Sequence, residues 1–146
     1  MDRFHYQPLD ALIAQLLRGP RRLRLNQLVG CEFLLSVIEP GGSYPFDFVR
    51  HALTGYRPVH AEDGDGHSLD GDKLIEDLIV AAEVLSEAAD LVVETWPEAV
   101  WTAEALAKRL DVSGKTICRW RRRGLTGWRF RGRDQRSRLL FPERSV

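Results

Sequence analysis

The 146 residues of this chain suffice for one ordinary domain or two small ones, and their 44% hydrophobic and 29% charged residues are typical of a globular protein. No apolar run approaches the ~18 residues of a membrane helix and no secretory signal begins the chain, so we expect a cytoplasmic protein with no membrane partner. The net charge of zero divides into a basic end, residues 101–146, with 13 Lys and Arg against 4 Asp and Glu (+9), and an acidic start, residues 1–100, with 8 against 17 (−9). This asymmetry favours nucleic-acid binding by the basic end and a different role for the acidic part.

The acidic part is predicted to be helical. Hydrophobic residues at helical spacing indicate four helices, at about Pro8–Arg18, Arg22–Ile38, Pro45–Thr54 and Leu69–Val93. The second helix counts among its apolar positions Leu25, Leu28, Val29 and Leu35. Residues of about 57–70, between the third and fourth helices, show no periodicity and predict a flexible loop. Pro97 marks the end of this acidic helical domain, which we place at residues 1–96.

Two short helices joined by a tight turn are predicted to begin the basic part, residues 97–146. Thr102 is suited to cap a helix that begins at Ala103. Ser113 is suited to cap a second helix, which runs from Gly114 to Arg123. Asp111 and Val112 complete the turn between them, and two helices with so short a turn are the signature of a helix-turn-helix.

The second of these helices has an apolar side and a cationic side. Ile117 and Trp120 lie three residues apart and are expected to face the core. The opposite side carries the cations Lys115, Arg119 and Arg122, flanked by Arg123. Such a row fits the major groove of DNA, where Arg and Lys bind guanine O6 and N7. Ser113, Thr116 and the amides of the first helical turn can bind phosphate oxygens.

Beyond Leu125 the hydrophobic period changes from that of a helix to that of a strand, which predicts a β-hairpin with its turn at Gly132 to Gln135. One face of the first strand carries Trp128 and Phe130, and one face of the second carries Leu139 and Phe141. An Arg-rich hairpin after a recognition helix is a wing, and its candidate contacts to the DNA backbone or minor groove are Arg131, Arg133 and Arg136. The aromatic residues expected in the core, rather than as platforms for stacking bases, are Trp101, Trp120, Trp128 and Phe130.

The string WTAEALAKRLDVSGKTICRWRRRGL, from Trp101 to Leu125, resembles the MerR/excisionase type of winged helix-turn-helix. The turn, the apolar positions and the cap occur at the spacings of that type, and the resemblance covers roughly residues 100–146. This resemblance implies that the residues in contact with DNA are Ser113, Lys115, Thr116 and Arg119.

A second resemblance covers the whole chain. The string YPFDFVRHALTGYRP, from Tyr44 to Pro58, followed by a long helix and then this winged helix, is similar to the N-terminal extension of certain bacterial sigma-70-like RNA polymerase factors. In that group the extension precedes the regions that bind polymerase and promoter, so we expect either a fragment of a sigma-like factor or a stand-alone regulator. The string itself serves either to start and end a helix or as a docking surface, and its chemistry does not distinguish the two.

The sequence indicates no other chemistry. Asp63 to Ser68 resembles a calcium loop only faintly, because Ser68 stands where the loop needs glycine and Leu74 where it needs glutamate. The histidines lack zinc spacing, and there is no nucleophile motif or phosphate-binding Gly loop. Cys31 and Cys118 are predicted to be buried thiols. We therefore expect neither an enzyme nor a protein with a cofactor or metal.

The predicted fold is mainly α, with an acidic helical N-terminal domain followed by a winged helix-turn-helix with a small β-hairpin. The predicted function is sequence-specific binding of double-stranded DNA in transcription regulation or initiation, in a sigma-factor context and at the cytoplasmic nucleoid. Two alternatives stay open: a module that tethers a sigma-like factor to RNA polymerase, and an excisionase-like architectural protein that bends DNA. RNA polymerase and a second copy of the chain are further candidate partners, since helix-turn-helix proteins commonly bind DNA as dimers.

Overall fold

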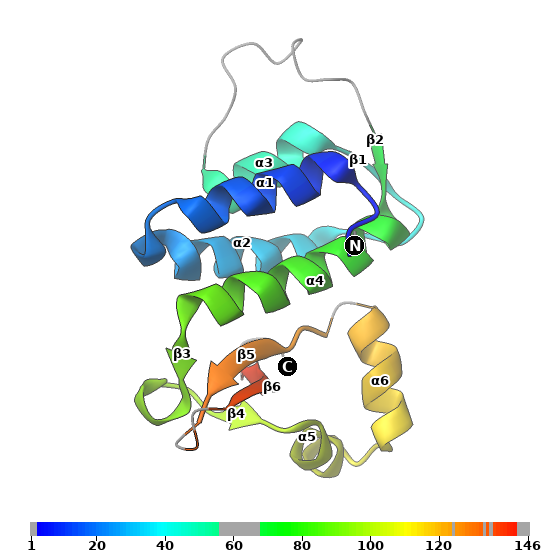
Figure 1. The fold of residues 1–146 in the computed structure, drawn as a ribbon. Coiled ribbons are helices and arrows are strands. Elements are labelled where there is room, and N and C mark those ends of the chain that lie inside the picture. Colours follow the sequence, from blue (N-terminus) through cyan, green and yellow to red (C-terminus); the bar gives the residue numbers. More distant parts are fainter. Residues whose placement is uncertain (1–2, 56–67, 124, 133, 135, 143–146) are drawn as a thin grey trace.

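The computed structural model describes residues 3–55, 68–123, 125–132, 134 and 136–142. The chain is mainly helical, as its sequence predicts, with two small β-sheets. Four helices form a layer that lies above a smaller part built from two helices and a short hairpin in the view of Figure 1. The expected flexible loop of about 57–70 lies for the most part outside the described residues, but its last three form a strand.

The helices of the layer are α1 (Gln7–Arg18), α2 (Arg24–Val37), α3 (Phe46–Thr54) and α4 (Gly71–Ala89). A 3-10 turn, η1 (Arg21–Leu23), takes the first residues of the second predicted helix. Helix α2 packs between α3 and α4, and α1 covers α4 and α3. Their buried faces carry Leu9, Ile13, Leu28, Leu34, Val49, Leu74, Leu78 and Leu85, which the helical period brings onto one side of each helix.

Two helices of the layer end on a residue with left-handed backbone. Gly55 ends α3 with φ at 74°, a conformation that glycine adopts without a Cβ clash. Asp90 ends α4 with φ at 53°, so this helix stops before the predicted end at Val93. The chain leaves it as strand β3 (Leu91–Val92) and a 3-10 turn, η3 (Val93–Thr95). The prediction for this end was therefore wrong, because Asp90 tolerates the left-handed turn that few residues other than glycine adopt.

The strands make two sheets that the sequence predicts only in part. Strand β1 (Ser43–Pro45) pairs antiparallel with β2 (Ser68–Asp70), so Leu69 belongs to a strand and not to the fourth helix. The second sheet has the order β3-β5-β6-β4, with β4 (Val100–Trp101), β5 (Trp128–Arg131) and β6 (Ser137–Pro142). Strands β5 and β6 are the predicted hairpin, and β3 pairs with β5 in parallel.

The start of the chain is fastened to α4 by a buried carboxylate. Asp77 accepts hydrogen bonds from the backbone N–H groups of His5 (2.7 Å) and Tyr6 (3.0 Å). The Tyr6 hydroxyl in turn accepts a hydrogen bond from the N–H of Asp70 at 2.8 Å. These contacts hold the beginning of α1 against the beginning of α4.

The two short helices of the basic part are α5 (Ala103–Leu110) and α6 (Gly114–Arg122). The Thr102 hydroxyl caps α5 by accepting from the Ala105 N–H at 3.0 Å. The Ser113 hydroxyl caps α6 by accepting from the Thr116 N–H at 3.2 Å. Both caps lie where the sequence predicts them.

The β5–β6 hairpin belongs to two hydrophobic clusters at once. Trp128, Phe130 and Leu140 are buried in the cluster of the helical layer. Phe141 is buried in a second cluster with residues of α5 and α6. The Trp96 ring packs edge-on against Trp128 and Phe130, with centroids 5.8 and 5.4 Å apart. The helical layer and the basic part therefore share a core across the predicted boundary at residue 97.

A fragment of residues 97–146 alone should not fold stably, because it would expose Trp128, Phe130 and Leu140 to water. Exposing one buried large apolar side chain lowers the free energy of unfolding by about 1.5–3 kcal/mol. Circular dichroism and thermal unfolding of the fragment, beside the intact chain, check this. A cooperative unfolding transition in the fragment at the temperature of the intact chain would contradict the shared core.

Candidate nucleic-acid interface

Helix α6 is held in place through one fully buried side chain. Ile117 has no exposed surface and packs in the cluster of Leu106 and Ala107, on α5, and Phe141, on β6. Val112, in the turn between the helices, lies half-buried at the edge of this cluster. The expected inward position of Ile117 is confirmed, and the opposite side of the helix is left to solvent.

The beginning of α6 brings together the four residues that the winged-helix resemblance implies. Ser113, Lys115 and Arg119 are exposed and Thr116 is half-buried. The Ser113 and Thr116 hydroxyl oxygens lie 3.1 Å apart, and Arg119 Nη2 donates to the Thr116 hydroxyl at 3.2 Å. This chain of hydrogen bonds orders the Arg119 guanidinium along the face of the helix.

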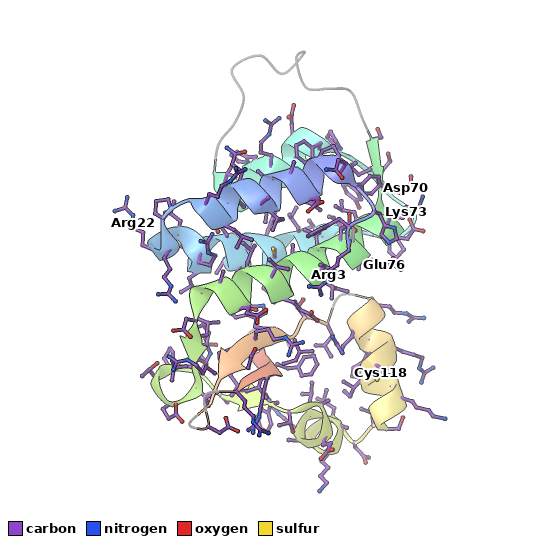
Figure 2. The ribbon with its side chains drawn as sticks, viewed as in Figure 1. Arg3, Arg22, Asp70, Lys73, Glu76 and Cys118 are labelled. Atoms are coloured by element: carbon purple, nitrogen blue, oxygen red, sulfur yellow. The ribbon has the colours of Figure 1, made fainter. Side chains whose placement is uncertain are left out.

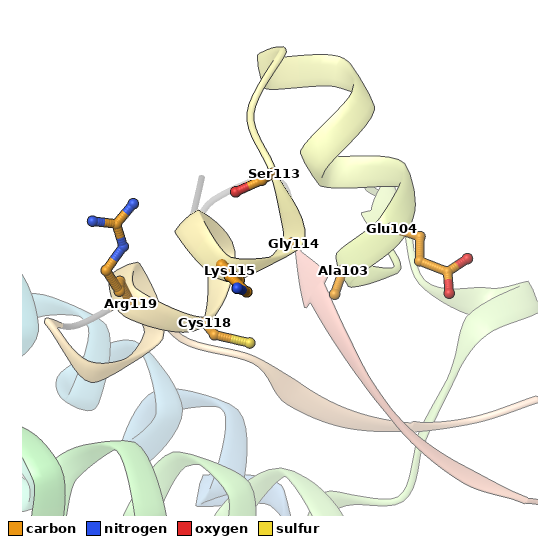
Figure 3. A pocket seen from close by; sticks show the side chains of 7 residues that line it. All are labelled: Ala103, Glu104, Ser113, Gly114, Lys115, Cys118 and Arg119. Atoms are coloured by element: carbon orange, nitrogen blue, oxygen red, sulfur yellow. The ribbon is translucent and has the colours of Figure 1, made fainter.

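An open hollow of about 740 Å³ lies between the beginnings of α5 and α6. Its lining comes from Ala103 and Glu104 on α5, and from Ser113, Gly114, Lys115, Cys118 and Arg119 on or beside α6. Figure 3 shows Arg119 and Glu104 on opposite sides of this hollow. The first amides of a helix lack an intrahelical acceptor, and Gly114 leaves the backbone there uncovered by a side chain, so the hollow offers donors to an anion.

Two residues of α6 were predicted to be buried and are not. Trp120 is 37% exposed, although its spacing from Ile117 suggested a place in the core. The inward position beside Ile117 is taken instead by Arg121, which turns toward α4. Periodicity alone misses this orientation of α6 because it has no information about the charge that attracts Arg121. Cys118, the second of the two residues, is exposed. Cys31 is buried as predicted, and burial raises the pKa of its thiol.

That charge is Glu83, a carboxylate in the middle of α4. One of its oxygens lies 3.1 Å from Arg121 Nη2, and the other lies 3.2 Å from Arg3 Nη2. The Glu83 side chain is only 15% exposed, so water screens these pairs less than it screens surface pairs. Glu83 thus joins the chain start, α4 and α6. The sequence analysis did not identify Glu83. The only sign of such a partner in the sequence is Arg121, a cation at an inward position of α6.

The predicted cations of the hairpin are placed differently from those of α6. Arg131 is engaged by Asp90 at the end of α4, with N–O distances of 2.9 and 3.2 Å. Arg136 is exposed in the turn, and Arg133 lies outside the described residues. Figure 1 shows the turn end of the hairpin and α6 at opposite sides of the basic part. The structure therefore does not bring Arg131 and Arg136 together with Lys115 and Arg119.

Arg122 and Arg123 are the last two of the cations predicted to bind DNA from α6. Arg122 is the final residue of α6, and its side chain lies outside the described part of the structure. Arg123 is exposed and forms the C-cap, where its backbone N–H donates to the Trp120 carbonyl at 2.9 Å. Among the predicted cations of α6, the structure therefore shows exposed side chains at Lys115, Arg119 and Arg123.

Comparisons of this chain with protein-family models, with curated proteins and with solved structures found no match. Within the described residues, no helix is both long and apolar enough to cross a membrane. The same residues contain no group of three or more His, Cys, Asp or Glu side chains placed to hold a metal ion. The inference about function therefore depends on the geometry of α6 and on the sequence.

Replacing Glu83 should loosen α6 from the helical layer. Glu83→Ala leaves Arg3 and Arg121 without their carboxylate partner, and we expect the free energy of unfolding to fall by about 1–3 kcal/mol. Denaturant titration of the intact chain measures this. The control is Asp134→Ala, which removes an exposed pair with Arg138 and should cost less than about 1 kcal/mol. Equal small losses in both variants would show that Glu83 does not anchor α6.

Proposed function

We propose that the chain binds double-stranded DNA through α6, as a winged helix-turn-helix protein that acts in transcription regulation or initiation. The observation that carries this proposal is the two-sided character of one short, capped helix. Ile117 is buried while Lys115 and Arg119 are exposed. A helix fixed by its inner face can enter the major groove with its outer face, because the groove is wide enough to admit one helix.

The proposed contacts follow from the chemistry of the exposed groups. Arg119 is suited to bind guanine O6 and N7 with its two-pronged guanidinium, and Lys115 adds a point charge beside it. The Ser113 hydroxyl and the amides at the start of α6 donate to phosphate oxygens, which set the orientation of the helix in the groove. Thr116 supports Arg119 through the 3.2 Å hydrogen bond between them.

The charge division gives the complex a preferred orientation. The basic end of +9 carries α5, α6 and the hairpin, whereas the acidic part of −9 carries the helical layer on the other side in Figure 1. Phosphates attract the first and repel the second, so the duplex approaches from the side of α6. Most of the affinity then comes from displaced counterions, and binding weakens steeply as salt rises.

The transcriptional part of the proposal is supported by sequence resemblance. The string from Tyr44 to Pro58, followed by a long helix and then the predicted winged helix, is similar in sequence to the N-terminal extension of certain bacterial sigma-70-like factors. In this proposal the acidic layer faces away from DNA and remains accessible to the transcription machinery.

Substitutions in α6 test the groove assignment. Arg119→Ala should weaken binding to a duplex enriched from a random pool by about 1–3 kcal/mol, because a two-pronged base contact is lost. Fluorescence anisotropy with the labelled duplex measures the dissociation constant. The matched control is Arg18→Ala, an exposed arginine at the end of α1 that should leave the constant unchanged.

A charge reversal at Arg119 tests the contact of α6 with DNA without requiring a known DNA target sequence. Arg119→Glu should abolish most binding to a duplex of mixed sequence at low salt, since it places a carboxylate against phosphates. Arg18→Glu changes the net charge equally and should bind almost as the original chain does. If the two reversals have the same effect, binding reflects net charge and α6 is not the contact.

Lys115→Ala should change the salt dependence of binding. Removing one phosphate contact lowers the slope of log affinity against log salt by about 1, while sequence preference stays the same. Titrations at several salt concentrations measure the slope. An unchanged slope would remove Lys115 from the phosphate contacts.

A further inference from the structure

An apolar stripe runs along the outward face of α2, between the exposed polar residues Asn26 and Ser36. Four residues spaced four apart are between 40% and 51% exposed: Leu25, Val29, Phe33 and Val37. Residues four apart lie on one side of a helix, so these side chains form one continuous stripe. Single exposed apolar residues are normal on a protein surface, but a continuous stripe is typical of an interaction surface.

The stripe cannot turn inward, because the other side of α2 is already packed. Leu28, Cys31 and Leu34 are fully buried against the core of the helical layer. Gly30 brings the backbone of α2 so close to α3 that a Cβ there would lie 2.3 Å from the Ala52 carbonyl oxygen. Helix α2 is thus fixed in rotation, and the stripe is a preformed surface.

We propose that a second copy of this chain covers the stripe, with the two α2 helices packed antiparallel about a two-fold axis. The stripe is complementary to itself in this arrangement. Its middle falls between Val29 and Phe33, so Val29 of one copy meets Phe33 of the other, and Leu25 meets Val37. A two-fold interface requires such a match, since the same patch serves both copies.

The charges at the ends of the stripe select the antiparallel arrangement. Arg22 is exposed just before α2, and Glu39 is exposed just after it. Figure 2 shows the Arg22 side chain extending outward from this end of the layer. Antiparallel packing brings Arg22 of one copy toward Glu39 of the other, whereas parallel packing would bring like charges together.

The arrangement also places both DNA-binding parts on one side. In Figure 1, α2 crosses the molecule behind α1 and α4, and α5 and α6 lie below it. A two-fold axis perpendicular to α2 and in the plane of the interface leaves both copies of α6 below the paired helices. Helix-turn-helix proteins use such pairs to read two half-sites. The dimer itself rests on the α2 surface and stands or falls independently of DNA binding.

Sedimentation of the intact chain without DNA tests the dimer. The original chain should sediment as a dimer, and Phe33→Glu should raise the dimer dissociation constant about 100-fold or more, because two rings leave an apolar contact and two carboxylates enter it. Gln15→Glu, at an exposed position of α1 away from the stripe, should change nothing. Circular dichroism confirms that each variant folds. A monomer at every concentration, or a dimer that Phe33→Glu leaves intact, would overturn the proposal.

A charge exchange tests the antiparallel direction. Arg22→Glu alone and Glu39→Arg alone should each weaken the dimer several-fold, since each places like charges together across the interface. The double variant Arg22→Glu with Glu39→Arg should restore the original dissociation constant. Failure of the double variant to recover would exclude antiparallel packing of α2.

Discussion

The structure depends on a short hairpin that is buried on both faces. Trp128 and Phe130 of β5 fill the core of the helical layer, and Phe141 of β6 fills the core beneath α5 and α6. The Trp128 indole also donates to a Glu32 oxygen at 3.0 Å, so the same residue has an apolar and a polar contact with the layer. Because packed interiors transmit shifts rather than absorb them, the position of α6 follows that of the layer. The acidic helices therefore fix the position of α6.

Ion pairs with the helical layer distinguish two pairs of cations in the basic end. Arg121 and Arg131 turn toward α4 and meet Glu83 and Asp90. Lys115 and Arg119 face solvent. The acidic charge of the layer thus neutralises the inward cations and leaves the outward ones for a partner. This division gives the acidic part a structural role.

The sequence is informative where local chemistry decides the structure. Thr102 and Ser113 are predicted as caps because a hydroxyl before a helix accepts from its first amides, and the structure confirms both. Ile117 is predicted inward by spacing alone, and it is fully buried. The mainly α class follows from the same periodicity. These effects are short-range, because the interacting residues lie close together in the sequence.

The features that the sequence does not reveal depend on long-range contacts. Trp120 was expected inside, but Arg121 takes that side of α6 because Glu83 lies 38 positions away and close in space. Strand β3 forms only because the hairpin returns to pair with Leu91 and Val92. Leu25 and Val29 fit the helical period of α2 as well as Leu28 does, yet only Leu28 is buried. Periodicity identifies apolar residues but does not say which of two apolar sides is packed within one chain.

DNA binding through α6 is tested most directly by mapping the DNA-contacting surface with NMR. Backbone amide shifts of the intact, isotopically labelled chain would be followed while a mixed-sequence duplex is added at low salt. If α6 binds DNA, the largest changes lie at Ser113, Lys115, Thr116 and Arg119, and the helices of the acidic layer are almost unaffected. Changes centred on the acidic layer, or none in α6 at saturating duplex, would contradict DNA binding through α6.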